Sequence, residues 1–303
     1  MRDLVIIGGG PAGLTAGLYA ARSRLDVVLF ERLMPGGQML MTDQIENYPG
    51  FPEGLTGFEL VDRMKRQAES FGLPIESREV RSVDFSGPVK KLMTDNGPVE
   101  AKVVILAGGA VPRKAGIDGE RAFTGKGVSY CATCDGPFYR DQEVAVIGGG
   151  DTAVEEALFL TRFASRVHLV HRRDTLRAVK LLQERARSEA RLDIIWSTIP
   201  TAITGADSVN GLELNNLVSG EKTLLPVQGV FVFVGYSPCS DLVKGVVDLD
   251  REGFVITDEN LATSSAGVFA AGDIRSKLLR QVATAVGEGA TAAFAAERYL
   301  ETL

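Results

Sequence analysis

The sequence predicts an α/β fold in which a second domain is inserted into the first, and three observations support this prediction. A pattern of apolar strand, glycine-rich turn and helix occurs twice, at residues 3–23 and 143–160. Composition breaks on both sides of the second copy separate it from the two ends of the chain. The 303 residues, of which 45% are hydrophobic, are enough to give two domains a core each.

The first copy begins with DLVIIGGGPAG, an apolar strand that runs into Gly8, Gly10 and Gly13 before a helical segment. In such a turn one glycine permits the bend, one lets the backbone approach a pyrophosphate and one lets helix pack on strand. A second strand, DVVLFE, ends at Glu31, 18 residues past Gly13. A carboxylate there suits ribose hydroxyls and would repel a 2′-phosphate. These residues predict a Rossmann-like dinucleotide site, although a lone turn of this kind could be no more than a tight loop.

The second copy, EVAVIGGGDTAVEEALFL, places Gly148, Gly150 and Ala153 in the three special positions. Its second strand ends in Arg172 and Arg173, where the first copy has a carboxylate. Arginine at this place can neutralise and hold a 2′-phosphate. We therefore expect NADPH here and a dinucleotide without that phosphate in the first copy. The alternative is a solvated basic face at the start of a helix.

The order of these segments predicts the domain boundaries. The strand VVILAGG is followed by a polar segment, and a second break comes at VFVFVGYSPCSDL. The tail, which contains GVFAAGDI and a helix of small residues, is expected to return to the first domain. We expect residues 1–113 and 242–303 to form the first domain and residues 114–241 the second. The two crossings would form a natural hinge.

Two of the three cysteines, Cys131 and Cys134, form a Cys-x-x-Cys pair ahead of the second glycine-rich turn. Such a pair can open and close a small ring, and a lowered thiolate pKa makes one sulfur nucleophilic. The alternatives are a structural disulfide and a zinc site with His168 and His171. Side chains three apart on a predicted strand should face opposite sides, which disfavours zinc, and we expect no metal.

Charge and hydropathy exclude other classes of partner. The net charge is −6 and no basic run is present, so we expect binding neither to nucleic acid nor to an anionic membrane surface. No stretch approaches the roughly 18 apolar residues of a membrane-spanning helix. We expect a cytoplasmic protein with soluble partners.

Further motifs extend the pattern over nearly the whole chain. They are GGGPAG, GGQ at 36–38, ENYPGF at 46–51, CATCDG from Cys131, GGGDTAVEEA from Gly148, HRRDTLRA from His171, and GVFAAGDI with RQ within 267–281. In this order they resemble the bacterial low-molecular-weight thioredoxin reductases of the pyridine nucleotide-disulfide oxidoreductase family. The resemblance implies two Rossmann-like, three-layer ββα domains, with the NADPH domain inserted into the FAD domain.

The resemblance also implies the ligands of each nucleotide. FAD would contact Gly8, Gly10, Gly13, Glu31, Gly37, Gln38, Asn47, Gly272, Asp273, Arg280 and Gln281, with Asp273 reaching the ribityl chain. NADPH would contact Gly148, Gly150, Asp151, Thr152, Arg172, Arg173 and Arg177. Asn47 could instead serve only a turn, and Asp273 only a helix N-cap.

The implied reaction begins with hydride transfer from NADPH to FAD. Two electrons would then reach the Cys131–Cys134 disulfide, and the dithiol would reduce thioredoxin or a thioredoxin-like protein by exchange. Asp135 resembles the acid of the family, but it could instead cap a turn. We expect the inserted domain to rotate about the two crossings and the chain to form a homodimer.

Some residues depart from the family pattern, and other functions stay open. Met39 and Met41 stand where a Thr-rich run is common, and Cys239 with Ser240 where Asn and Thr are usual. We expect Cys239 to be a small buried residue, with a stray reactive thiol as the alternative. The alternative functions are a ferredoxin-linked thioredoxin reductase, a flavin-dependent dithiol oxidase and a redox sensor.

Overall fold

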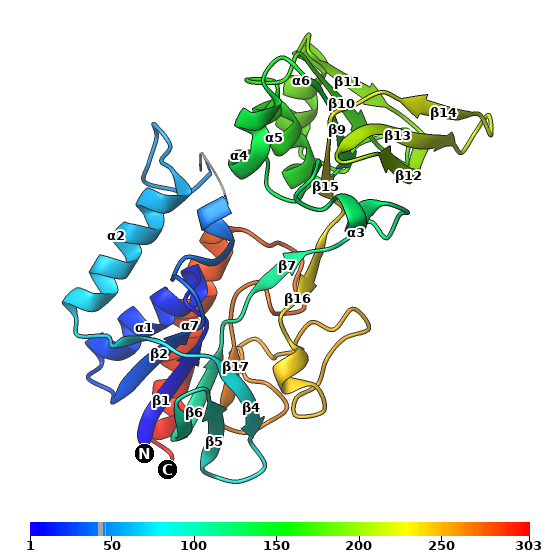
Figure 1. The fold of residues 1–303 in the computed structure, drawn as a ribbon. Coiled ribbons are helices and arrows are strands. Elements are labelled where there is room, and N and C mark those ends of the chain that lie inside the picture. Colours follow the sequence, from blue (N-terminus) through cyan, green and yellow to red (C-terminus); the bar gives the residue numbers. More distant parts are fainter. Residues whose placement is uncertain (42–44, 46) are drawn as a thin grey trace. The chain divides into compact units, whose positions relative to one another are not determined.

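The computed structural model describes every residue except 42–44 and 46, so that part of the ENYPGF motif lies outside the described residues. The chain forms two compact units (Figure 1): unit 1 contains residues 1–111 and 237–303, and unit 2 contains residues 112–236. Unit 2 is thus inserted into unit 1, with crossings at 111/112 and 236/237 where the sequence suggests 113/114 and 241/242. Two short strands at the crossings, β7 (Ala110–Pro112) and β16 (Tyr236–Pro238), pair with each other.

Unit 1 is built on a mixed sheet in the order β3-β2-β1-β6-β5-β4, and β17 also pairs with β6. The parallel strands are β1 (Arg2–Ile7), β2 (Val27–Glu31), β3 (Ile75–Ser77), β6 (Gly97–Leu106) and β17 (Val268–Ala270). The antiparallel strands are β4 (Val80–Asp84) and β5 (Lys90–Thr94). The helices are α1 (Pro11–Arg22), η1 (Gly37–Met41), α2 (Gly57–Ser70), η3 (Asp241–Val243) and α7 (Val282–Leu300).

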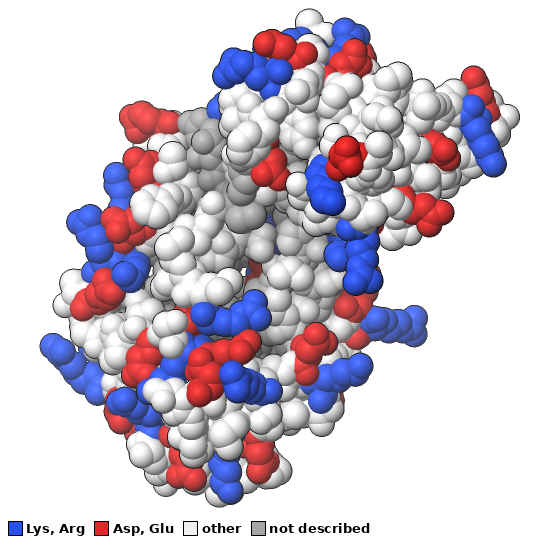
Figure 2. Space-filling model, viewed as in Figure 1, with Lys and Arg blue, Asp and Glu red and all other residues white. Residues whose placement is uncertain are grey.

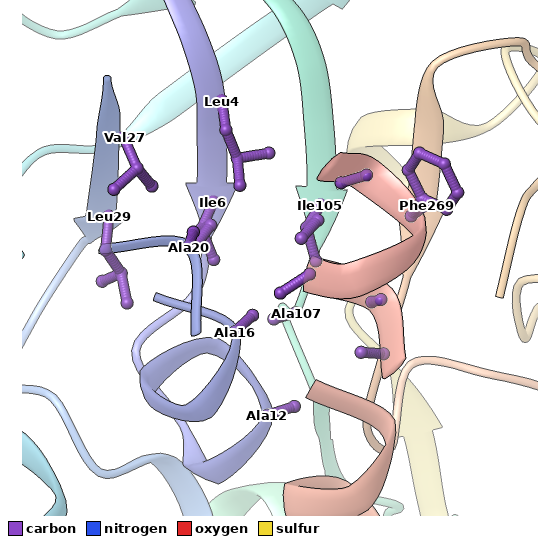
Figure 3. Close-up of a cluster of buried hydrophobic side chains, with 14 of the residues drawn as sticks. Leu4, Ile6, Ala12, Ala16, Ala20, Val27, Leu29, Ile105, Ala107 and Phe269 are labelled. Atoms are coloured by element: carbon purple, nitrogen blue, oxygen red, sulfur yellow. The ribbon is translucent and has the colours of Figure 1, made fainter. Parts of the chain in front are cut away.

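Side chains alternate across the central strands of this sheet, as the period of two of a β-strand requires. Leu4 and Ile6 of β1 belong to the core cluster that also contains alanines of α1 and α7. Val5 belongs to a separate cluster, together with Val243 of η3 and Val268 of β17. In Figure 3, Ala16 of α1 lies near Ile105 and Ala107, whereas Ala12 points towards α7. Small residues on both helices let their backbones come close to the sheet and to each other.

Unit 2 contains a parallel sheet in the order β11-β10-β9-β15-β8 and an antiparallel sheet in the order β12-β13-β14. The strands are β8 (Val128–Ser129), β9 (Glu143–Gly148), β10 (Arg166–Val170), β11 (Leu192–Ile195), β12 (Thr198–Gly205), β13 (Val209–Asn216), β14 (Lys222–Leu225) and β15 (Gly229–Phe233). The helices are α3 (Glu120–Phe123), α4 (Ala132–Asp135), η2 (Gly136–Tyr139), α5 (Asp151–Leu160) and α6 (Lys180–Ser188).

The two faces of the parallel sheet in unit 2 are covered differently. Val144 and Val146 of β9 share a core cluster with residues of α4, α5 and α6. Ala145 and Ile147, which alternate with them, share a cluster with Leu212 and other residues of the antiparallel sheet. The layers are therefore helix, parallel sheet and antiparallel sheet, which confirms the α/β, three-layer ββα prediction for this unit.

The surface and the helices give two further observations. On the face that Figure 2 shows, basic and acidic side chains are interspersed in small groups. Within the described residues, no helix combines the length and the apolar character needed to cross a membrane.

Candidate nucleotide and disulfide sites

The glycine-rich turn of unit 1 lies between β1 and α1, and each glycine has a different environment. Gly8 has a φ of 108°, which L-residues with side chains rarely adopt. A Cβ on Gly13 would collide with the carbonyl oxygen of Gly8. A Cβ on Gly10 would meet no described atom within 4 Å. The first and third glycines thus serve the packing of the turn, whereas the space in front of the second stays open for a ligand.

The Glu31 carboxylate at the end of β2 lies beside this turn. Its Oε2 accepts a hydrogen bond from the Gly9 amide at 2.7 Å, and its Oε1 accepts one from the Leu33 amide at 3.0 Å. Two backbone donors therefore hold the carboxylate at the position where the pattern predicts contact with a ribose.

The other residues proposed for FAD come from distant segments of unit 1. Gly37 begins η1, and a Cβ on it would lie 3.5 Å from the Gly10 Cα, which places the GGQ motif against the glycine-rich turn. Gln38 follows in η1 and is half-buried. Asn47 Nδ2 donates a hydrogen bond to Gln281 Oε1 at 3.1 Å, although 234 positions separate the two residues. The contact shows that Asn47 does more than serve a local turn.

The segment after β17 carries two buried polar atoms without hydrogen-bond partners among the described residues. One is Asp273 Oδ1, whose contact is an ion pair with Lys277 Nζ at 3.2 Å, and the other is Arg280 Nε. Gly272 has a φ of 81°, and a Cβ on it would lie 2.8 Å from the Ala12 Cβ. The N-cap of α7 is Gln281, so Asp273 does not cap that helix. Buried polar atoms that make no hydrogen bond, of which Arg280 Nε is the clearer case here, are uncommon and often mark ligand sites. Together with the open space at Gly10, they fit a dinucleotide such as FAD.

The glycine-rich turn of unit 2 lies between β9 and α5 and has the same division of roles. A Cβ on Gly148 would lie 2.5 Å from the Ala153 Cβ, whereas one on Gly150 would meet no described atom within 4 Å. Asp151 and Thr152 begin α5. Asp151 Oδ1 accepts a hydrogen bond from the Val179 amide at 2.8 Å, so this carboxylate fastens the following loop to the turn.

The loop after β10 carries three exposed arginines, Arg172, Arg173 and Arg177, and none of them forms an ion pair with a described residue. The Arg177 amide donates a hydrogen bond to the Gly149 carbonyl at 2.7 Å. The arginine loop therefore lies beside the open position of the turn. Three unpaired guanidinium groups next to a helix N-terminus fit an additional phosphate.

His171, the first residue of HRRDTLRA and the residue that a zinc site would have used, is a buried member of this loop. Its Nδ1 lies 2.8 Å from the Gly148 carbonyl oxygen and its Nε2 lies 3.0 Å from that of Thr175. Burial and the nearby Arg177 and Arg173 lower the pKa of His171, although the two carbonyl contacts act in the opposite direction. The imidazole links the arginine loop to the glycine-rich turn. The feature of the sequence that could have indicated this linking role is the position of the histidine directly before Arg172 and Arg173.

The redox segment begins at the end of β8. Cys131 is disulfide-bonded and only 7% exposed. Its Sγ lies 3.3 Å from Thr133 Oγ1, and since a disulfide sulfur carries no proton, the hydroxyl is the donor. The side chain of Cys134 lies outside the described residues, so its pairing with Cys131 stays a prediction. The Asp135 amide donates to the Cys131 carbonyl at 3.2 Å, and the Asp135 carboxylate forms no cap hydrogen bond on η2.

The redox segment is held firmly within unit 2. Ala132 of α4 is fully buried in the cluster that contains Ala153 and Ala157 of α5, so α4 rests on the helix that begins at the second glycine-rich turn. The Tyr130 hydroxyl donates to Glu120 Oε1 at 2.7 Å. Burial and the Glu120 carboxylate raise the pKa of Tyr130 to about 12. Neither Tyr130 nor Glu120 belongs to a motif that would mark it in the sequence as a support of the redox segment.

Three remaining expectations concern histidines, cysteines and methionines. His168 Nε2 lies 2.9 Å from Glu143 Oε2, away from the carbonyls that His171 contacts, and no group of three His, Cys, Asp or Glu within the described residues could hold a metal.

The prediction of a buried Cys239 is wrong, because its side chain is exposed. The next residue, Ser240, is buried instead and donates to the Gly253 carbonyl at 2.6 Å. Met39 packs in a core cluster, and the side chain of Met41 lies outside the described residues.

Comparisons with known proteins agree with this geometry. The family model for pyridine nucleotide-disulphide oxidoreductases matches residues 2–289. Thioredoxin reductases from Peptoclostridium acidaminophilum and Mycolicibacterium smegmatis are 49% and 48% identical, over 99% of this chain and 97% of theirs. The crystal structure of the Lactococcus lactis thioredoxin reductase is 44% identical, covers 100% of both chains and superposes with a TM-score of 0.98.

These likenesses span both units, and they do not favour a dithiol oxidase, a ferredoxin-linked reductase or a sensor. The chain therefore belongs to the pyridine nucleotide-disulphide oxidoreductase family and, within it, to the thioredoxin reductases.

Proposed function

We propose that this chain is an FAD-containing, NADPH-dependent reductase that acts on the disulfide of thioredoxin or a thioredoxin-like protein. The observation that supports this best lies in unit 2. The disulfide-bonded Cys131 directly precedes α4, which packs on α5, and the arginine loop is hydrogen-bonded to the glycine-rich turn at the start of the same helix. A unit that carries both a site for a 2′-phosphate and a redox disulfide has the parts needed to connect NADPH to thiol exchange.

When bound, NADPH supplies a hydride and FAD passes two electrons on to the disulfide. In unit 1, Gly10 leaves room for the pyrophosphate of FAD, Glu31 accepts from the ribose, and Asp273, Arg280, Gln281 and Asn47 offer polar atoms to the flavin side. In unit 2, Gly150 leaves room for the pyrophosphate of NADPH, and Arg172, Arg173 and Arg177 bind its 2′-phosphate.

The reduced Cys131–Cys134 pair then acts on the partner. One thiolate attacks the partner's disulfide, so that one S–S bond breaks while a mixed disulfide forms and a partner thiolate leaves. The second thiolate attacks the mixed disulfide, which restores the intramolecular disulfide and releases the dithiol form of the partner. Asp135, next to the pair and without a cap hydrogen bond, supplies a proton to the leaving thiolate. Rotation of unit 2 about the two crossings would present the nicotinamide of NADPH and the Cys131–Cys134 disulfide to the flavin in turn.

Anaerobic titration of the holoenzyme with NADPH tests the proposal. We expect about two equivalents of NADPH per flavin, one for the flavin and one for the disulfide, followed by reoxidation when oxidised thioredoxin is added. Cys131→Ser should lower the uptake to about one equivalent, whereas Cys239→Ser, the matched control, should retain about two. A flavin that NADPH leaves oxidised while reduced ferredoxin bleaches it would contradict the proposal.

We also propose that the chain forms a homodimer in the cytoplasm. Tyr19 on α1 and Phe294 on α7 are 42% and 59% exposed beside a hollow of about 290 Å³. Exposed aromatic rings of this kind are typical of protein interfaces. Light scattering should give the mass of two 32.4 kDa chains, and Phe294→Asp should shift the mass towards one chain. A monomeric wild-type protein would contradict this assignment.

A further inference from the structure

A cluster of four charged side chains holds the turn after β17. Glu288 Oε2, on α7, accepts a hydrogen bond from the Gly272 amide at 2.7 Å. Glu288 Oε1 lies 3.0 Å from Arg275 Nη1, and Lys277 Nζ lies 3.3 Å from both Glu288 oxygens. Lys277 Nζ is also 3.2 Å from Asp273 Oδ1. One helix residue is thereby tied to the backbone of the turn and to both of its cations.

Burial makes these ion pairs important. The side chains of Lys277, Arg275 and Glu288 are 8%, 12% and 17% exposed. Two cations face two carboxylates, so the charges of the cluster balance. A buried charge that loses its partner is costly, whereas an exposed ion pair contributes little. Removal of Lys277 would leave the Asp273 carboxylate, which is 32% exposed, without its ion-pair partner, and Glu288 with Arg275 alone.

The cluster connects two residues that belong to the proposed FAD site. Asp273 Oδ1 accepts no hydrogen bond from the described residues, and its ion-pair partner is Lys277. Arg280 Nη2 donates to the Arg275 carbonyl at 3.2 Å, and its guanidinium carbon lies 3.9 Å from the centre of the Phe254 ring. Arg275 is also held by a hydrogen bond from its Nε to Thr257 Oγ1 at 2.9 Å.

We propose that Glu288, Arg275 and Lys277 are positioning residues for the flavin half of FAD. Glu288 fastens the Gly272–Asp273 turn to α7, and Lys277 attracts one oxygen of Asp273, which leaves the other oxygen for a ribityl hydroxyl. This inference rests on the proposed function, since it takes the FAD site as given. It predicts that the cluster affects the flavin half of the ligand and leaves the adenine half unaffected.

Binding of two ligands to the flavin-free full chain tests this prediction. FAD is titrated by the quenching of its fluorescence, and ADP, which has the adenosine and pyrophosphate but no ribityl chain, by calorimetry. Lys277→Met should weaken FAD binding by about tenfold or more and change ADP binding by less than about twofold. Lys277→Arg, which keeps the cation, should stay within about threefold of wild type for FAD. Lys244→Met, an exposed lysine of the same unit, serves as the matched control.

Two results would overturn the inference. Wild-type FAD affinity in Lys277→Met would mean that the lysine does not position Asp273. An equal loss of FAD and ADP affinity would mean that the variant has damaged the whole site. If Lys277→Met does not fold, Glu288→Gln, which keeps the shape of the side chain, takes its place, and its affinities for FAD and for ADP are measured in the same way. A wild-type chain that binds ADP but not FAD would instead show that the flavin assignment itself fails.

Discussion

Alanine substitutions at Gly10 and Gly13 separate the two demands on the first glycine-rich turn. A Cβ at Gly13 would collide with the Gly8 oxygen and lie 3.0 Å from the Gly8 carbonyl carbon. Overpacking costs about 1–3 kcal/mol, and because a backbone carbonyl cannot rotate away as a side chain can, we expect about 3 kcal/mol for Gly13→Ala. For a unit of this size the loss corresponds to a Tm lowered by about 6–12 °C.

Gly10→Ala should behave differently. Gly10 has an extended backbone, with φ −73° and ψ −175°, and its Cβ would enter open space. The lower entropy of the unfolded chain and the poorer N-cap roughly offset each other, so we expect the stability to change by less than about 1 kcal/mol. The same Cβ would occupy the space that a pyrophosphate needs, so FAD affinity should fall by about tenfold or more.

Thermal unfolding of the flavin-free chains, together with FAD titration, distinguishes these effects. The reasoning predicts a stable Gly10→Ala that binds FAD weakly and a destabilised Gly13→Ala. An equal loss of stability in both variants would refute the division of roles between the two glycines. Wild-type FAD affinity in Gly10→Ala would refute the placement of the pyrophosphate.

Three further predictions concern unit 2. Replacement of Arg172 and Arg173 by alanine should raise the KM for NADPH by about one to two orders of magnitude, because only NADPH carries the 2′-phosphate, and a parallel rise in the KM for NADH would contradict this. His171→Asn should reduce the pH dependence of the free energy of unfolding. The pKa of His171 is lowered in the folded chain, so below about pH 6.5 the unfolded chain takes up the proton first. The wild-type chain therefore loses stability as the pH falls. The urea midpoints at about pH 7.5 and about pH 5.5 should therefore differ more in wild type than in the variant, and equal differences would exclude this role. Tyr130→Phe removes the hydroxyl that donates to Glu120 and should cost about 1.5–3 kcal/mol in urea unfolding; an unchanged midpoint would show that the amides of residues 115 and 116 satisfy the carboxylate.

The two glycine-rich turns between strand and helix could be predicted because each is a local structure. Gly8, Gly13 and Gly148 sit where a Cβ would strike a neighbour within the same strand–turn–helix unit or the adjacent strand, so the residue type itself records the constraint. The predicted glycines lie at the strand–helix junctions of β1 and α1 and of β9 and α5. The insertion of one domain into the other was likewise readable, because glycine and proline end an apolar strand at each crossing.

Cys239 shows where such reasoning fails. Its small, apolar side chain suggests burial, yet the residue is exposed while Ser240 is buried. The Cys239 amide donates to the Gly109 carbonyl at 3.0 Å, and this pairing between distant segments determines which of two neighbouring side chains faces inward. Residue type alone does not contain that information.

The sequence by itself determined the local features of this protein: two glycine-rich turns between strand and helix, a carboxylate after one and arginines after the other, and a cysteine pair ahead of the second. Only the tertiary structure decided which distant side chains meet. It brought Asn47 to Gln281, His171 to the second turn, and Glu288 to the backbone of Gly272. These contacts depend on the packing of helices and loops against a sheet whose strands come from both ends of the chain. The patterns of residue type along a single segment report only the forces within that segment.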